Sequence, residues 1–74
     1  MVEISDSVVD ELIERYRLYM VEYLRYTLGM AEKRATEVVE KSVTYQLLKD
    51  KELKYWCESK ECILDMLLDE ILTT

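Results

Sequence analysis

The feature that most constrains the fold is the scarcity of helix-breaking residues: the 74 residues include no proline and only one glycine. Proline and glycine interrupt regular structure most strongly, so few positions remain at which a helix must end. Apolar residues over 9–24 recur at intervals of three and four, which is the period of an amphipathic helix and fits no strand. The sequence therefore predicts an all-α fold, a small bundle of three or four helices.

The limits of these helices follow from local signals. The first is predicted over 5–28, because Ser5 suits an N-cap and Gly29 suits a C-terminal cap. A second helix is predicted over 30–49, although its β-branched residues around position 43 also suit an extended segment. After a kink and a short helical piece near Trp56, Ser59 is expected to cap a last helix over 60–72.

The length of the chain bears on its stability. Seventy-four residues form one domain, 1–74, with a single core. A chain of this size buries only about 60% of the surface that its unfolded form exposes. Small proteins often gain the missing stability from a partner chain, so we expect the bundle to be completed by dimerisation.

Charge is distributed unevenly along the chain. Residues 1–14 carry five acids and 61–74 carry four, without a base, whereas 15–60 hold all ten bases against seven acids. The net charge of −6 repels a phosphate backbone, so nucleic acid is not the expected partner. The N-terminus is acidic where a signal peptide is basic, and no apolar run approaches a membrane span. We therefore expect a cytoplasmic protein with no membrane partner.

Residues suited to catalysis are few. The chain has no histidine, which excludes Ser–His and Cys–His pairs, and its lone glycine cannot form a phosphate-binding loop. Cys57 and Cys62 do not make a zinc site by themselves, and we expect two reduced, partly buried thiols. The sequence therefore predicts a protein that is not an enzyme and that binds no cofactor or metal.

Two pairs of acids offer an alternative. Glu37 and Glu40 are three residues apart and Asp65 and Asp69 are four apart, so each pair shares a helix face. Such pairs on facing helices can hold a hard divalent cation, as in small helical nucleotide pyrophosphohydrolases. The ExxE signature of those enzymes is matched once, at 37–40, and their second motif, ExxD, is absent. Acids are common on the surfaces of helices. A metal-dependent helical enzyme is therefore a weaker alternative than the two functions considered next.

Three segments share a family resemblance: LIERYR at 12–17, YLRYTLG at 23–29, and Ala35 followed by EVVE at 37–40. They resemble the start of region 2 in extracytoplasmic-function sigma factors, over about half of the chain. The resemblance implies two helices that dock on RNA polymerase. The later part of that region, which reads promoter DNA, is not recognisable here. The alternative function is thus a small transcription regulator whose basic central segment contacts nucleic acid or polymerase.

The leading hypothesis comes from apolar residues outside the main stripe of the first helix. Leu18, Val21 and Leu28 project away from that stripe by about 100–200° of helical wheel. Together with Leu47 and Leu68, they exceed what one small core can bury, and surplus apolar surface often marks a binding site for a protein partner. The sequence thus predicts a non-enzymatic interaction or regulatory module, a homodimeric helical bundle whose interface includes these five residues.

Overall fold

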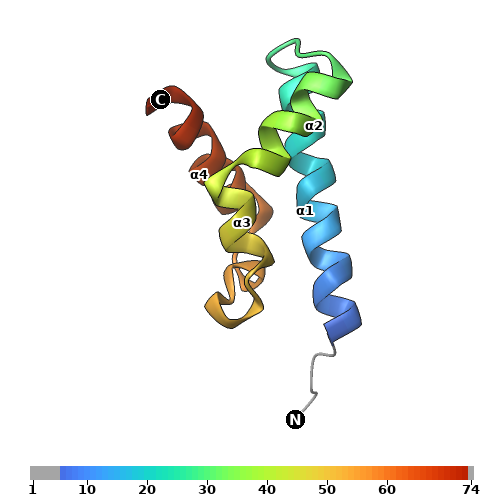
Figure 1. Ribbon diagram of the computed structural model, residues 1–74, viewed down its shortest axis with the longest axis vertical. Helices are drawn as coiled ribbons and strands as arrows, with labels where there is room; N and C mark the ends of the chain where they lie inside the picture. The colour runs from blue at the N-terminus through green and yellow to red at the C-terminus, as the bar shows by residue number, and fades with distance from the viewer. Residues whose placement is uncertain (1–5, 74) are drawn as a thin grey trace.

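The computed structural model describes residues 6–73, which fold into four α-helices and two short 3-10 helices. The order is α1 (Asp6–Tyr26), α2 (Glu32–Lys41), α3 (Val43–Lys49), η1 (Lys51–Leu53), η2 (Tyr55–Cys57) and α4 (Lys60–Thr73). These residues include no strand, so the predicted all-α fold is confirmed, with four α-helices (Figure 1). None of the helices within 6–73 is both long enough and apolar enough to cross a membrane.

The first and last helices have nearly the predicted limits. α1 ends at Tyr26, and Gly29 follows in the left-handed region with φ of 70°. The amide of Met30 then donates to the carbonyl of Leu24 at 3.1 Å, which satisfies a carbonyl of the last turn. At the other end, the Ser59 hydroxyl accepts from the amide of Cys62 at 3.2 Å, so the predicted cap of α4 is confirmed. The predicted cap at Ser5 lies outside the described residues.

The prediction of one continuous helix over 30–49 is wrong, because the chain breaks at Ser42. Its backbone is extended, with ψ of 150°, between α2 and α3. The Ser42 hydroxyl donates to the carbonyl of Val39 at 2.6 Å and accepts from the amide of Tyr45 at 3.0 Å. One side chain therefore donates a hydrogen bond to a carbonyl in the last turn of α2 and caps the first turn of α3.

A second group, Glu70 of α4, caps the same end of α3. Its carboxylate accepts from the amides of Val43 and Thr44, and from the Thr44 hydroxyl, at 2.9 Å each. Burial raises the pKa of Glu70, but the hydrogen bonds from Thr44 and Val43 lower it more, so the net pKa lies below its usual value. This contact explains an acid near the C-terminal end of α4, where the helix dipole disfavours negative charge.

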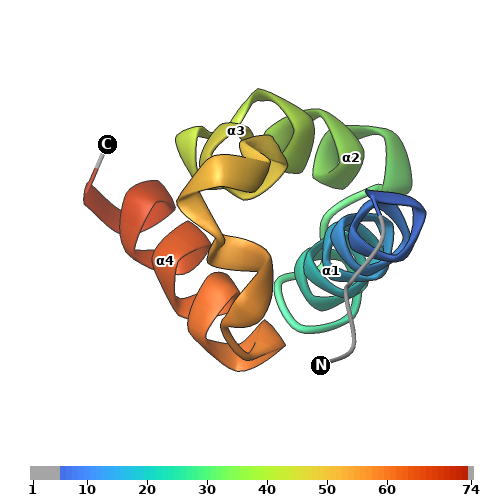
Figure 2. The same cartoon turned by 90° about the horizontal axis from the view of Figure 1, so that it is seen from below.

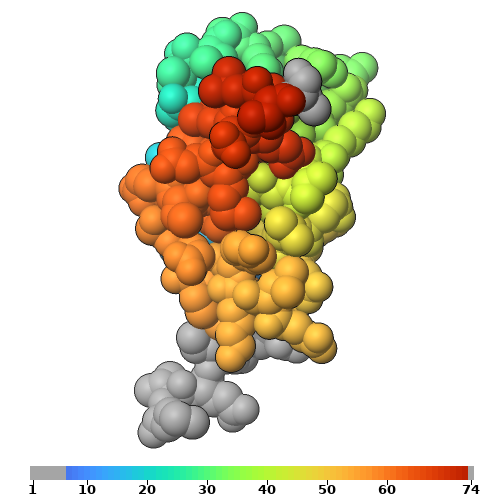
Figure 3. Space-filling model, turned by 90° about the vertical axis from the view of Figure 1, so that its left-hand side faces the viewer, coloured from blue at the N-terminus to red at the C-terminus, as the bar shows by residue number. Residues whose placement is uncertain are grey.

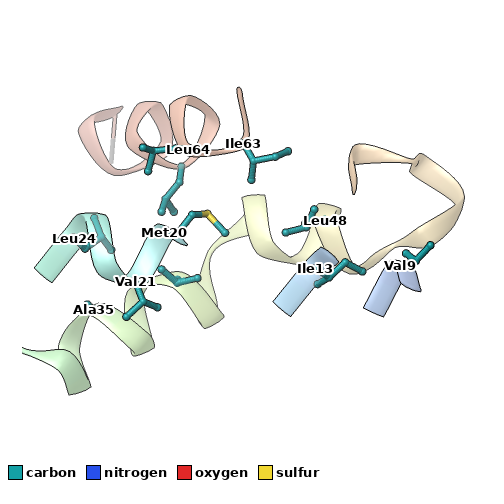
Figure 4. Packing of buried hydrophobic residues seen from close by; sticks show 11 residues of the cluster. Val9, Ile13, Met20, Val21, Leu24, Ala35, Leu48, Ile63 and Leu64 are labelled. Carbon is teal, nitrogen blue, oxygen red and sulfur yellow. The ribbon is translucent and has the colours of Figure 1, made fainter. Parts of the chain in front are cut away.

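α1 lies along one side of the molecule, and α2, α3 and α4 form an arc around its inner face (Figure 2). Seen from the α4 side, α4 and the segment at 50–59 lie in front of most of α1 (Figure 3). The core between these elements consists of buried aliphatic side chains from α1, α2, α3 and α4: Val9, Ile13, Met20, Val21, Leu24, Ala35, Val39, Leu48, Ile63, Leu64 and Leu67 (Figure 4).

Polar contacts tie the 3-10 segment to α1. The Tyr16 hydroxyl lies 2.6 Å from the carbonyl oxygen of Glu58 and 3.3 Å from that of Trp56, so it can donate to either. Burial, followed by the nearby charges of Cys57, Glu61 and Glu58, raises the pKa of Tyr16. The ammonium of Lys51 lies 2.8 Å from Asp10 on the first turns of α1. These contacts position the segment that leads into α4 along the inner side of α1.

Candidate interaction surfaces

The structure separates the five residues predicted to form an interface. Leu18 and Leu28 are 46% and 50% exposed, whereas Leu47 on α3 and Leu68 on α4 are half-buried. Val21 is only 6% exposed, so the expectation that it stays at the surface of a single chain is wrong. It lies near Ala35 of α2 (Figure 4), and α1 also packs against α4. Because α2 and α4 cover different sides of α1, the buried arc of α1 is wider than its main apolar stripe indicates.

The side of α1 that faces away from the bundle carries a mixed surface, which we call the outer face. Its members recur every three or four residues and lie within an arc of about 100°. They are Val8, Glu11, Arg15, Leu18, Glu22 and Arg25. All are exposed except Arg25, which is half-buried. Leu28 is 50% exposed but lies beyond the end of α1, and it is not part of the outer face.

The charges of the outer face are only partly paired within the chain. Arg15 lies 3.0 Å from Glu11, but their side chains are 70% and 64% exposed, so the pair contributes little stability. The sequence spacing indicates an ion pair between Glu22 and Arg25, which does not form, because the Arg25 guanidinium lies over the Tyr26 ring at 5.1 Å. Among residues 6–73, Glu22 has no ion-pair partner.

A different cluster of charges links α1 to α2. Arg17 forms two hydrogen bonds with Glu14, one of them at 3.0 Å, and lies 3.9 Å from Glu40 on α2. The hydrogen bond to Arg17 lowers the pKa of Glu14 more than burial raises it. The Arg17 side chain is only 19% exposed, so this cluster is structural and does not belong to the outer face.

A groove lies between α2 and α4, with a volume of about 350 Å³. Its apolar lining comes from Met30, Val38 and Ile71, and its basic residues are Arg34 and Lys41. The carboxylate of Glu70 also borders the groove, but it already accepts three hydrogen bonds from α3. The groove therefore presents apolar and cationic contacts without an arrangement of nucleophile and base.

The acids of the metal-enzyme hypothesis lie on two helices, Glu37 and Glu40 on α2 and Asp65 and Asp69 on α4. Within the described part of the chain, no group of three or more Asp, Glu, Cys or His residues is placed to hold a metal ion. The geometry thus gives this hypothesis no support.

The two cysteines are free thiols on the surface. The expectation that Cys57 and Cys62 are partly buried is wrong, because both are exposed. Cys62 lies in the first turn of α4, where the following residues, Ile63 and Leu64, take the buried positions.

Val8 and Glu22 are outer-face residues that the predicted interface omits. Val8 is 46% exposed, as much as Leu18, and lies about one helical turn before Glu11. The alternation of apolar, acidic and basic residues at spacings of three and four was the signal available in the sequence. It is obscured there, because the same helix carries a stronger apolar stripe on its inner face.

Comparisons with known proteins add no family or relative: no protein-family model, curated protein or solved structure matches the chain.

Proposed function

We propose that this domain is a non-enzymatic interaction module that forms a homodimer through the outer face of α1. One observation carries the proposal: Val8 and Leu18, both on the outer face of α1, are each 46% exposed. The inner side of the same helix is covered by α2, α3 and α4. An apolar stripe that the chain does not cover itself is typical of a surface that binds protein.

The mixed charge of the outer face supports a protein partner over a nucleic acid. Glu11 and Glu22 alternate with Arg15 and Arg25, so the face carries no net charge and offers no basic track for phosphates. A twofold contact between two copies is the commonest symmetric solution for a small protein. It also supplies the additional buried surface that a chain of 74 residues needs.

Magnitudes indicate that the affinity is modest. Full burial of a Val or Leu side chain contributes about 1.5–3 kcal/mol, so burying the exposed half of one contributes about 1 kcal/mol. Two such side chains, Val8 and Leu18, from each of two chains contribute about 4 kcal/mol. Association costs at least about 4 kcal/mol in lost freedom of motion. We therefore expect a weak dimer, with further stability from polar contacts across the interface.

A matched pair of substitutions tests the proposal. Leu18→Glu places a charge in the centre of the outer face, whereas Leu72→Glu places the same charge on α4, where the side chain is 83% exposed. Light scattering coupled to gel filtration at high micromolar concentration should give a dimer for the unmodified protein and for Leu72→Glu, and a monomer for Leu18→Glu. A Leu18→Glu variant as dimeric as the control would exclude the outer face as the interface.

A further inference from the structure

Between Glu11 and Arg25, the order of residue types along the outer face is unchanged when the face is read backwards and each charge is inverted. Leu18 is at the centre. Three and four residues away lie Arg15 and Glu22, and seven residues away lie Glu11 and Arg25. A surface with this order is complementary to a copy of itself that runs in the opposite direction.

We infer that the outer face binds the α1 helix of a second copy in an antiparallel orientation, with the twofold axis at Leu18. This inference rests on the proposed function, and it adds the orientation and register of the partner. Leu18 then contacts Leu18 of the second copy, and Arg15 faces Glu22 of that copy. Glu11 faces Arg25 of the second copy. Symmetry repeats each unlike contact, so the interface holds four ion pairs around the contact between the two Leu18 side chains.

A parallel arrangement of the same two helices lacks this complementarity. It places each acid against its own copy and each base against its own copy, so Glu11, Arg15, Glu22 and Arg25 all meet like charges. Like charges that face each other across an interface destabilise it and exclude that orientation. The charges of the outer face therefore select the antiparallel orientation, while the apolar residues supply most of the affinity.

Two features of the single chain agree with this register. Glu22 is exposed and has no ion-pair partner among residues 6–73, so it is available to an arginine of the second copy. The pair between Arg15 and Glu11 joins two side chains that are mostly exposed, so Arg15 can turn toward a second carboxylate at little cost. In the single chain all outer-face residues except the half-buried Arg25 are exposed, and Figure 2 shows α3 and α4 together on one side of α1.

Charge reversal tests the register. In the antiparallel dimer, Arg15→Glu faces Glu22 of the second copy, and Glu22→Arg faces Arg15 of the second copy. Each single variant then carries two like-charge contacts in place of two ion pairs, and its dimer dissociation constant should rise at least about tenfold at low salt. The double variant, Arg15→Glu with Glu22→Arg, restores opposite charges at both contacts. Its dissociation constant should return to within about threefold of the unmodified value.

Sedimentation equilibrium at low ionic strength measures these constants, with far-ultraviolet circular dichroism as the check that each variant is folded. Lys33→Glu, an equal charge reversal at an exposed position on α2, is the matched control and should leave the constant unchanged. A parallel dimer would leave both single variants close to the unmodified protein, because like charges already meet there. That result, or a double variant that stays weak, would overturn the antiparallel register while the homodimer stands. An unmodified protein that is monomeric would overturn both.

Discussion

The contact between Glu70 and the start of α3 leads to a prediction about stability. We predict that Glu70→Gln destabilises the fold by about 2–3 kcal/mol at pH 7. The carboxylate accepts three hydrogen bonds at 2.9 Å each, two of them from backbone amides. Thr44, which supplies two of the three donors, is only 3% exposed, so water cannot easily replace the carboxylate there. Leaving a buried donor without a charged acceptor costs about 1–3 kcal/mol, and losing a charge at a helix N-terminus adds about 0.3–1 kcal/mol.

The same contact predicts how stability depends on pH. The hydrogen bonds hold the pKa of Glu70 in the folded state below its unfolded value, so the folded state favours the charged form. The stabilisation is therefore fully present above the unfolded pKa of about 4.3 and is lost as pH falls through the lower folded pKa. Glu70→Gln should be clearly less stable than the unmodified protein at pH 7, and the difference should shrink at about pH 3.

Urea unfolding followed by circular dichroism measures both effects. All variants are compared at one protein concentration, because dimerisation makes apparent stability depend on concentration. Asp69→Asn is the matched control, since it removes a negative charge from the neighbouring exposed residue of α4. Equal stability of Glu70→Gln and Asp69→Asn, or a difference that does not shrink in acid, would refute the role assigned to Glu70.

Two further predictions concern other anchoring positions. Tyr16→Phe removes the hydroxyl that can donate to the carbonyl of Glu58 at 2.6 Å, and it should destabilise the fold by about 1 kcal/mol in the same urea assay, against Tyr26→Phe as an exposed control. Gly29→Ala should cost about 1 kcal/mol through backbone strain alone, because φ is 70° and no atom lies within 4 Å of an added Cβ. Unchanged thermal unfolding of Gly29→Ala would contradict the conformational argument.

Helix ends that depend on neighbouring residues could be predicted from the sequence. Gly29 and Ser59 act on backbone groups within a few positions of themselves, and both caps are found in the structure. The break at Ser42 has a local signal, because its hydroxyl caps α3 through the amide of Tyr45, but the predicted helix runs through this position. The second cap, from Glu70, lies 27 residues from Val43 in the sequence and leaves no local signal.

The residues of the predicted interface differ in the same way. The exposure of some follows from the sequence, whereas the burial of others depends on how the helices pack. Leu18 lies far from the inner stripe of α1, so its exposure follows from helical geometry alone. Val21 projects about 100° away from the stripe, and only the position of α2 decides that it is buried. The cysteines also depend on tertiary placement, because the buried side of α4 begins at Ile63.

The central claim is that the protein forms a homodimer, and sedimentation equilibrium of the unmodified protein tests it most directly. The measurement covers concentrations from about 1 μM to several hundred micromolar, since the apolar contacts of the outer face predict a weak dimer. The account predicts a reversible change from the mass of the 8.9 kDa chain to twice that mass as concentration rises. A single species with the mass of one chain over the whole range would contradict it.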